Sequence, residues 1–162
     1  MDMKYKIDLQ INVNNSDLPN RFVIQRWVST TLSHHNIDSA ELCIRVVDKT
    51  ESQQLNNQYR HKNYPTNVLS FPCELPEYIQ QEFQYHYLGD IIICADVVAE
   101  EAMQQSKVLE AHWAHMVIHG LLHLMGYDHI KVSEAKIMEQ LEIMLLTNMG
   151  YPNPYQDIIT NN

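Results

Sequence analysis

The pattern of hydrophobic and polar residues divides the chain into strands and helices that alternate. Residues 4–13 switch between apolar and polar side chains at every step, which is typical of a strand with one buried face. Residues 40–47 and 68–71 are shorter strand-like runs, and residues 88–95 are apolar enough for a strand covered on both faces. The pattern therefore predicts four strands.

Helical spacing of apolar residues separates these strands. The expected helices lie within residues 16–33, 48–59, 97–105, 108–125 and 133–149. Ser16 or Asp17 can cap the first helix, Asp48 or Thr50 the second, and Asp96 the third. The last helix is expected to end at Gly150, which is followed by Pro152.

Two of these helices have an apolar face that we expect in the core. In the first helix this face consists mostly of Phe22, Ile24, Trp27, Val28 and Leu32. In the last helix it consists of Ile137, Met138, Leu141, Met144, Leu145 and Met149. Methionines that recur at helical spacing indicate packing rather than a binding surface.

Four strands interleaved with about five helices predict one α+β domain, α/β-like in character, that spans residues 1–162. Helical connections favour parallel pairing of the strands that they join. The short link between residues 68–71 and 88–95 allows one antiparallel pair. We therefore expect a mixed, mostly parallel four-stranded sheet packed with helices, and an irregular stretch over residues 74–87.

Composition bears on where the protein works. No apolar run approaches the roughly 20 residues of a membrane span, and the N-terminus lacks the apolar run of a signal peptide. These features predict a soluble, cytoplasmic protein with no membrane partner. Cys43, Cys73 and Cys94 are then expected to be free thiols, because the reducing cytoplasm disfavours disulfides.

The net charge of −9 argues at first against a nucleic-acid partner. The charge is unevenly distributed, however. Residues 1–73 carry eight basic and seven acidic side chains, whereas residues 74–110 carry one and eight. A local basic surface can therefore form around Arg45, Lys49, Arg60, His61 and Lys62.

Three histidines, His119, His123 and His129, are the clearest chemical signal. The first two are four residues apart and share one helix face, so they can bind one ion together. Gly126 can take the left-handed conformation that ends a helix, after which His129 can fold back toward them. Three imidazoles leave one tetrahedral position of a zinc ion open, as in catalytic sites. Nickel, copper or cobalt would fit the same ligands.

The spacing of these histidines matches the long form of the helical zinc-protease signature, but without its base. That signature places a Glu directly after the first His, where it activates the metal-bound water. Here the position holds Gly120. The sequence therefore argues against peptide hydrolysis by the usual route, although a metalloprotease or amidase with another base stays open.

The histidine block also resembles a known family, the YbeY-type metal-dependent endoribonucleases, which are described as rRNA maturation factors. Residues 119–129 fit the family pattern His-Gly-x-Leu-His-Leu-x-Gly-Tyr-Asp-His at every fixed position. Further segments that resemble family motifs occur in the same order, at Leu55-Asn56, Tyr59-Arg60, Pro65 to Pro72, Leu88 to Ile91 and His112 to His115. The likeness runs from about residue 40 to the end.

The resemblance implies a single-domain α+β protein that holds one zinc ion through His119, His123 and His129. It also implies cleavage of single-stranded RNA, maturation of the 16S rRNA 3′ end, and ribosome quality control. The implied partners are rRNA and a ribosome or ribosome-associated protein, with no DNA. A zinc-stabilised ribosome-associated factor without catalysis is the alternative.

Several residues are candidates for roles in this chemistry. A zinc ion with three His ligands lowers the pKa of its bound water to about 7, so a hydroxide can attack the phosphodiester. Arg60 matches the family's active-site Arg and could hold a phosphate oxygen, unless it forms a surface ion pair. Lys62 is a further candidate for contact with the substrate. His115 could move a proton or orient a ligand, or be an ordinary core residue, and Asp128 could accept a hydrogen bond from a ligand imidazole.

Overall fold

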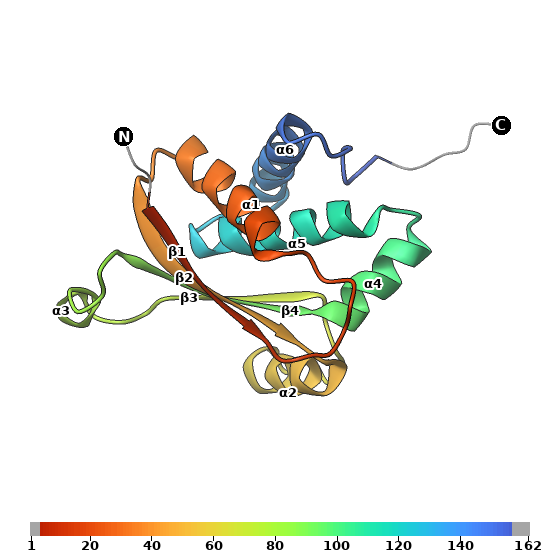
Figure 1. The fold of residues 1–162 in the computed structure, drawn as a ribbon, viewed down its shortest axis with the longest axis horizontal. Helices are drawn as coiled ribbons and strands as arrows, with labels where there is room; N and C mark the ends of the chain where they lie inside the picture. Colours follow the sequence, from red (N-terminus) through yellow and green to blue (C-terminus); the bar gives the residue numbers. More distant parts are fainter. Residues whose placement is uncertain (1–3, 157–162) are drawn as a thin grey trace.

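The computed structural model describes residues 4–156, in which six helices pack around one four-stranded sheet (Figure 1). The strands are β1 Lys4–Ile11, β2 Ser39–Val47, β3 Val68–Pro72 and β4 Tyr87–Cys94. Their order in the sheet is β1-β2-β4-β3, with β1, β2 and β4 parallel and β3 antiparallel to β4. The predicted α+β fold with a mixed, mostly parallel sheet is confirmed.

The helices cover both faces of the sheet. They are α1 Arg21–His34, α2 Lys49–Arg60, α3 Glu77–Gln80, α4 Ala95–Gln104, α5 Leu109–Leu124 and α6 Val132–Asn148. Helices α1 and α5 lie on one face with α6 beyond them, and α2 lies on the opposite face (Figure 1). Helix α5 packs against β3, β4, α1, α4 and α6, so it is the central helix of the fold.

Helix α5 carries the first two histidines of the block, and it is buried on almost every side. Trp113, Ile118 and Leu122 are among its fully or nearly fully buried side chains. Burial of one large apolar side chain contributes about 1.5–3 kcal/mol, so this helix is held firmly by the core. The backbone that carries His119 and His123 is therefore fixed before any ligand binds.

Gly120 lets α5 approach the sheet closely. A Cβ atom at this position would lie 2.8 Å from Cγ2 of Ile91 and 3.2 Å from Oγ of Ser70. Ser70 Oγ also donates a hydrogen bond of 3.2 Å to the Gly120 carbonyl. Position 120 thus faces the sheet, and glycine stands there because a larger residue would collide with the sheet.

Several element ends differ from the sequence prediction. The first strand ends at Ile11 rather than at residue 13. Helix α1 begins at Arg21, where Asn20 Oδ1 accepts a hydrogen bond of 2.9 Å from the Val23 N–H. Ser16 and Asp17 are therefore not its caps. Pro19 explains the delay, because a residue before proline is disfavoured in helical conformation.

The third predicted cap was also wrong, whereas the second is confirmed. Helix α4 already begins at Ala95, so Asp96 lies inside its first turn and accepts a hydrogen bond of 3.1 Å from Asn15 Nδ2. Asp48 caps α2 as expected, with its carboxylate 2.8 Å from the Glu51 N–H. The stretch over residues 74–87 contains the short helix α3.

Two residues predicted to be in the core are exposed. Phe22 is 87% exposed because it lies at the start of α1, and Ile137 is 54% exposed on α6. In α6 the predicted Met138 and Leu145 are buried, and Glu142 and Leu146 are buried in addition to them. The buried stripe of this helix thus includes a carboxylate that the sequence pattern did not indicate.

Cys43 and Cys94 are buried free thiols, and Cys73 is a half-buried one. Within residues 4–156, every helix is too short or too polar to cross a bilayer.

Candidate metal centre and substrate cleft

The structure brings the three predicted metal ligands together. His119 and His123 lie one turn apart on α5, and Gly126, with a φ of +100°, reverses the chain so that His129 returns to them. The ring centroids are 4.6 Å apart for His119 and His123, and 4.9 Å apart for His123 and His129. Ligand nitrogens of all three lie within 4.8 Å of one another.

Hydrogen bonds fix which ring nitrogens face the centre of this cluster. His119 Nδ1 donates to Glu142 Oε2 over 2.6 Å, and His123 Nδ1 donates to the Tyr127 carbonyl over 2.9 Å. Each Nε2 therefore presents a lone pair, and the two Nε2 atoms face each other at 3.1 Å. Two lone pairs this close are unfavourable unless a cation lies between them. Zinc–nitrogen bonds of about 2.0–2.1 Å at tetrahedral angles require nearly this spacing, so the residues fit such an ion.

Glu142 is the residue of the site that sequence reasoning missed. Its side chain is fully buried, and besides His119 it accepts a hydrogen bond from the Tyr155 hydroxyl. Burial alone would raise the pKa of Glu142, but its contacts with His115 and His119 outweigh this and lower the pKa to about 2. Glu142 is therefore ionised and sets the tautomer of His119. An acidic residue within the apolar stripe of the last helix was the available signal.

His115 contacts the buried partner of His119 rather than the cleft. Its Nε2 is 3.3 Å from Glu142 Oε2 and 3.3 Å from the Tyr155 hydroxyl. Burial lowers the pKa of His115, which favours the neutral imidazole. The side chain is not among those that line the cleft at the metal ligands.

Asp128 has a different partner from the one expected. Its Oδ1 accepts a hydrogen bond of 2.7 Å from the backbone N–H of His129. The carboxylate thus stabilises the loop that returns His129 to the cluster. The acceptors for the Nδ1 atoms of His119 and His123 are Glu142 and the Tyr127 carbonyl instead.

A cleft of about 730 Å³ opens onto the three histidines. It lies between the outer strand β3 and the chain that follows α5, and the end of α2 forms part of its wall. Arg60 lines this cleft together with the three histidines. Lys62 is exposed and does not line it.

Several contacts hold Arg60 at the cleft. It is the last residue of α2, and the neighbouring Tyr59 ring packs edge-on against Phe71 of β3, with centroids 5.0 Å apart. The buried Asn56 donates from Nδ2 to the Tyr64 carbonyl over 2.8 Å. His61, with a φ of +58°, ends the helix in a left-handed conformation. The segments that resemble the family thus anchor the helix end that bears Arg60.

The predicted basic surface is smaller than the sequence suggested. Arg45 pairs with Glu51, and Lys49 pairs with Glu100, so both charges are balanced. Across residues 4–156, Arg60 and Lys62 form no ion pair. Arg60 therefore keeps its charge available to an anion in the cleft.

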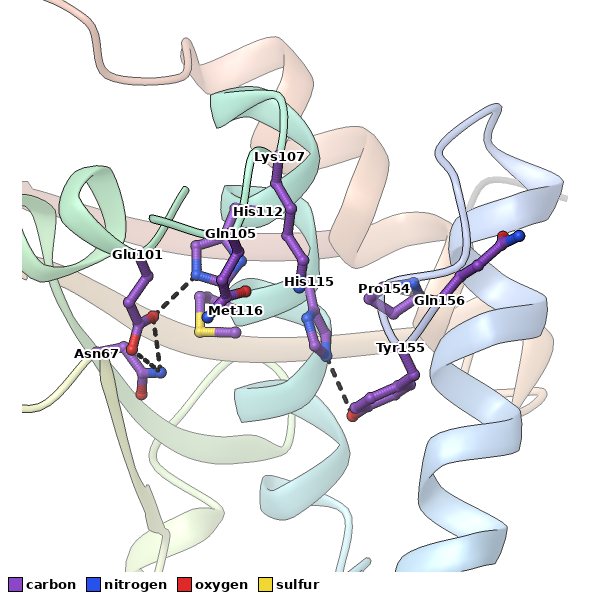
Figure 2. Close-up of a pocket in the computed structure, with 10 residues that line it drawn as sticks. All are labelled: Asn67, Glu101, Gln105, Lys107, His112, His115, Met116, Pro154, Tyr155 and Gln156. Carbon is purple, nitrogen blue, oxygen red and sulfur yellow. Dashed lines mark hydrogen bonds and ion pairs between the residues drawn. The ribbon is translucent and has the colours of Figure 1, made fainter. Parts of the chain in front are cut away.

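Figure 2 shows the residues that line a second cavity, of about 510 Å³. Asn67 lines both this cavity and the cleft at the three histidines. Glu101 lies in the wall of the second cavity and accepts hydrogen bonds from Asn67 Nδ2 at 3.1 Å and from His112 Nε2 at 2.9 Å. Partial burial raises the pKa of Glu101, but the hydrogen bonds from His112 and Asn67 outweigh it, and the net pKa is lowered. This cavity thus contains an ionised carboxylate.

Comparison with known proteins finds similar sequences and a similar fold. The family described as "Endoribonuclease YbeY" matches residues 7–150. A relative of that name from Cellvibrio japonicus is 48% identical over 154 residues, which cover 95% of this chain and 85% of the relative. The solution structure of TM1509 from Thermotoga maritima superimposes with a TM-score of 0.55 at 22% identity, over 93% of this chain and 99% of the other. At that identity the last match shows a shared fold alone.

Proposed function

Because the chain belongs to the YbeY endoribonuclease family, we propose that it is a zinc-dependent, cytoplasmic endoribonuclease specific for single-stranded RNA. We further propose that residues 1–162 act as one domain in maturation of the 16S rRNA 3′ end and in ribosome quality control. The observation that carries the proposal is the single cleft shared by His119, His123, His129 and Arg60.

The side chains of the cleft would have two roles, to bind the metal ion and to bind the phosphate. His119, His123 and His129 would hold the ion, and Glu142 and the Tyr127 carbonyl keep two of the imidazoles in the required tautomer. When bound, a zinc ion supplies a Lewis acid and brings the pKa of a water molecule near neutrality. Arg60 offers a planar, permanently charged fork that matches two phosphate oxygens, and it stabilises the negative charge that builds during attack.

The electrostatics of the cleft support a phosphodiester substrate. Asp128 is the one carboxylate among the described lining residues, and its Oδ1 already accepts the His129 N–H. The whole chain, however, has a net charge of −9, which repels a polyanion. Delivery of the RNA by the ribosome or by a protein bound to it would offset this repulsion.

The test is cleavage of single-stranded and duplex RNA by zinc-quantified protein. Arg60→Ala should keep its zinc and lose about 10²- to 10³-fold in the rate of cleavage, because it removes a positive group at the developing charge. Arg60→Lys should recover part of the rate, since the lysine ammonium keeps the positive charge but lacks the planar guanidinium that can bind two phosphate oxygens.

Two controls make this result interpretable. His119→Ala should lose the zinc and all cleavage, which excludes a contaminating nuclease. Lys62→Ala, two residues from Arg60 and outside the cleft lining, shows the effect of removing a nearby positive charge. Full activity of a zinc-loaded Arg60→Ala protein would refute the role of Arg60.

A further inference from the structure

A cavity of about 680 Å³ adjoins the metal cleft on the other side of Tyr127. We name it the Tyr127 hollow. Its lining residues are His35, Ile37, Ser39, His86, Leu88 and residues 124–127. Gly126 and Tyr127 line both this hollow and the metal cleft, so the two cavities meet along these residues.

Tyr127 takes part in both cavities through different groups. Its backbone carbonyl accepts the hydrogen bond from His123 Nδ1, within the metal site. Its ring packs edge-on against His35, with centroids 5.6 Å apart, and its hydroxyl lies 3.1 Å from His35 Nε2. His35 Nδ1 in turn donates to the Thr31 carbonyl over 2.8 Å. The Tyr127 ring is therefore held in place at the edge of the metal cleft.

The chemistry of the hollow suits an aromatic, uncharged group. Tyr127, His35 and His86 provide flat rings, while Leu88 and Leu124 provide apolar surface. No carboxylate lines it among the described residues. The cavity of Figure 2, which also adjoins the metal cleft, contains the ionised Glu101 and would repel a phosphate backbone.

We infer that the Tyr127 hollow binds a nucleobase of the single-stranded RNA whose phosphate lies in the metal cleft. The inference rests on the proposed function and adds the feature that selects single strands. A base can leave the stack and rest on an aromatic ring only when it is unpaired. Stacking does not depend on net charge, so it supplies affinity that this acidic chain lacks in ion pairs.

Tyr127→Ala tests the inference, because it removes the ring and keeps the carbonyl that His123 uses. The probe is a short single-stranded oligoribonucleotide with 2-aminopurine at successive positions, whose fluorescence falls when the base stacks. With zinc-loaded wild-type protein, we expect quenching at one position near the cleaved bond. Tyr127→Ala should lose this quenching and raise the KM about five- to 150-fold at unchanged zinc content. Tyr127→Phe should restore the quenching, because the ring is sufficient for stacking.

Two further measurements separate the possible failures. Tyr78→Ala removes an exposed tyrosine outside the hollow and should leave quenching and KM unchanged. An abasic residue at the quenched position should weaken wild-type binding as much as Tyr127→Ala does, without further loss in the variant. If the wild-type protein cleaves RNA but both changes leave KM unchanged, this inference is wrong. If the wild-type protein does not cleave RNA at all, the proposed function itself fails.

Discussion

At the scale of single residues, Glu142 determines how His119 can bind a metal ion. An ionised carboxylate accepts hydrogen bonds only, so the Nδ1 atom that it contacts must carry the proton. Nε2 is then left as the ligand atom. The Tyr155 hydroxyl donates to the other carboxylate oxygen and keeps Glu142 in place.

We predict that Glu142→Gln weakens zinc binding by about 10- to 100-fold, the usual effect of changing the partner of a ligand imidazole. The loss has two causes, since the amide removes a negative charge near the ion and no longer enforces one tautomer of His119. Competition with a chromophoric chelator measures the Kd. Glu139→Gln is the matched control, because Glu139 is exposed on the same helix. Equal affinities for the two variants would contradict the prediction.

Sequence analysis reached residues of the site by two routes: local spacing identified the histidine block, and the resemblance to the family identified Arg60. His119, His123, Gly126 and His129 lie within one short segment, so helix geometry and one turn are enough to bring them together. Glu142 lies 23 residues from His119 and reaches it only through the packing of α6 on α5. No local pattern specifies that packing, which is why Asp128 was chosen as the partner instead.

At the scale of elements, one carboxylate joins three segments. Glu101 of α4 accepts hydrogen bonds from His112 of α5 and from Asn67, the residue before β3. Since β3 and α5 form two walls of the metal cleft, this contact also helps to set the width of the cleft. The segment over residues 65–72 thus has a structural role besides its likeness to the family.

We expect Glu101→Gln to lower the free energy of unfolding by about 1.5–3 kcal/mol at pH 7, the usual contribution of hydrogen bonds to a charged group. The pKa of Glu101 is lower in the folded protein than its ordinary value of 4.5. Its ionised form therefore contributes fully above pH 4.5, and the contribution is lost as the pH falls through the lower, folded pKa. Wild type and variant should converge below pH 4.5.

Urea unfolding at pH 7 and at about pH 3.5 measures this convergence. Glu100→Gln is the control, since Glu100 is exposed on the same helix and pairs with Lys49 at the surface. Such surface pairs contribute about 0–1 kcal/mol. A difference between wild type and Glu101→Gln that stays constant across this range would show that the ionised carboxylate is not the cause.

Helix and strand positions could be predicted more reliably than the direction of each helix face. Asp48 was identifiable as a cap because a hydrophobic strand ends just before it, whereas Asn20 was hidden behind Pro19. The apolar period of the last helix correctly placed Met138 and Leu145 in the core, but it also placed Ile137 there, which is 54% exposed. Where two faces are similarly apolar, tertiary packing decides between them.

At the scale of the whole molecule, the three histidines of the candidate metal site lie outside the buried apolar core. The buried core cluster includes Trp27, Ile44, Ile91 and Trp113, which come from α1, the central strands and α5. The three ligands are less buried, and His129 is exposed. This arrangement differs from small zinc domains, whose folding depends on the ion.

Removal of zinc with a chelator should therefore leave the far-UV circular dichroism and a cooperative thermal transition, while RNA cleavage stops. A ligand present at 100 times its Kd adds about 2.7 kcal/mol to stability, so the Tm should fall by about 5–11 °C while the transition stays cooperative. Restored zinc should restore cleavage. Loss of the cooperative transition after chelation would instead favour the alternative in which zinc mainly holds the fold.

The sequence predicted the mixed sheet but not its strand order. Alternation of strands and helices indicated parallel pairs, and the short connection before β4 indicated the antiparallel one. The order β1-β2-β4-β3 depends on which face each helix covers, and α2 lies on the face opposite to α1 and α5. The placement of β3 at the edge is what gives the cleft an open side.

The close contact of Gly120 with the sheet limits which side chains can stand at position 120. The helical zinc-protease signature needs a carboxylate at this position. Here even a methyl group would meet the buried Ile91, so a glutamate could enter only if α5 rose from β3 and β4 and carried His119 and His123 with it. A glutamate at position 120 therefore requires more than one substitution, and directed evolution toward this protease signature would first have to repack the layer between helix and sheet.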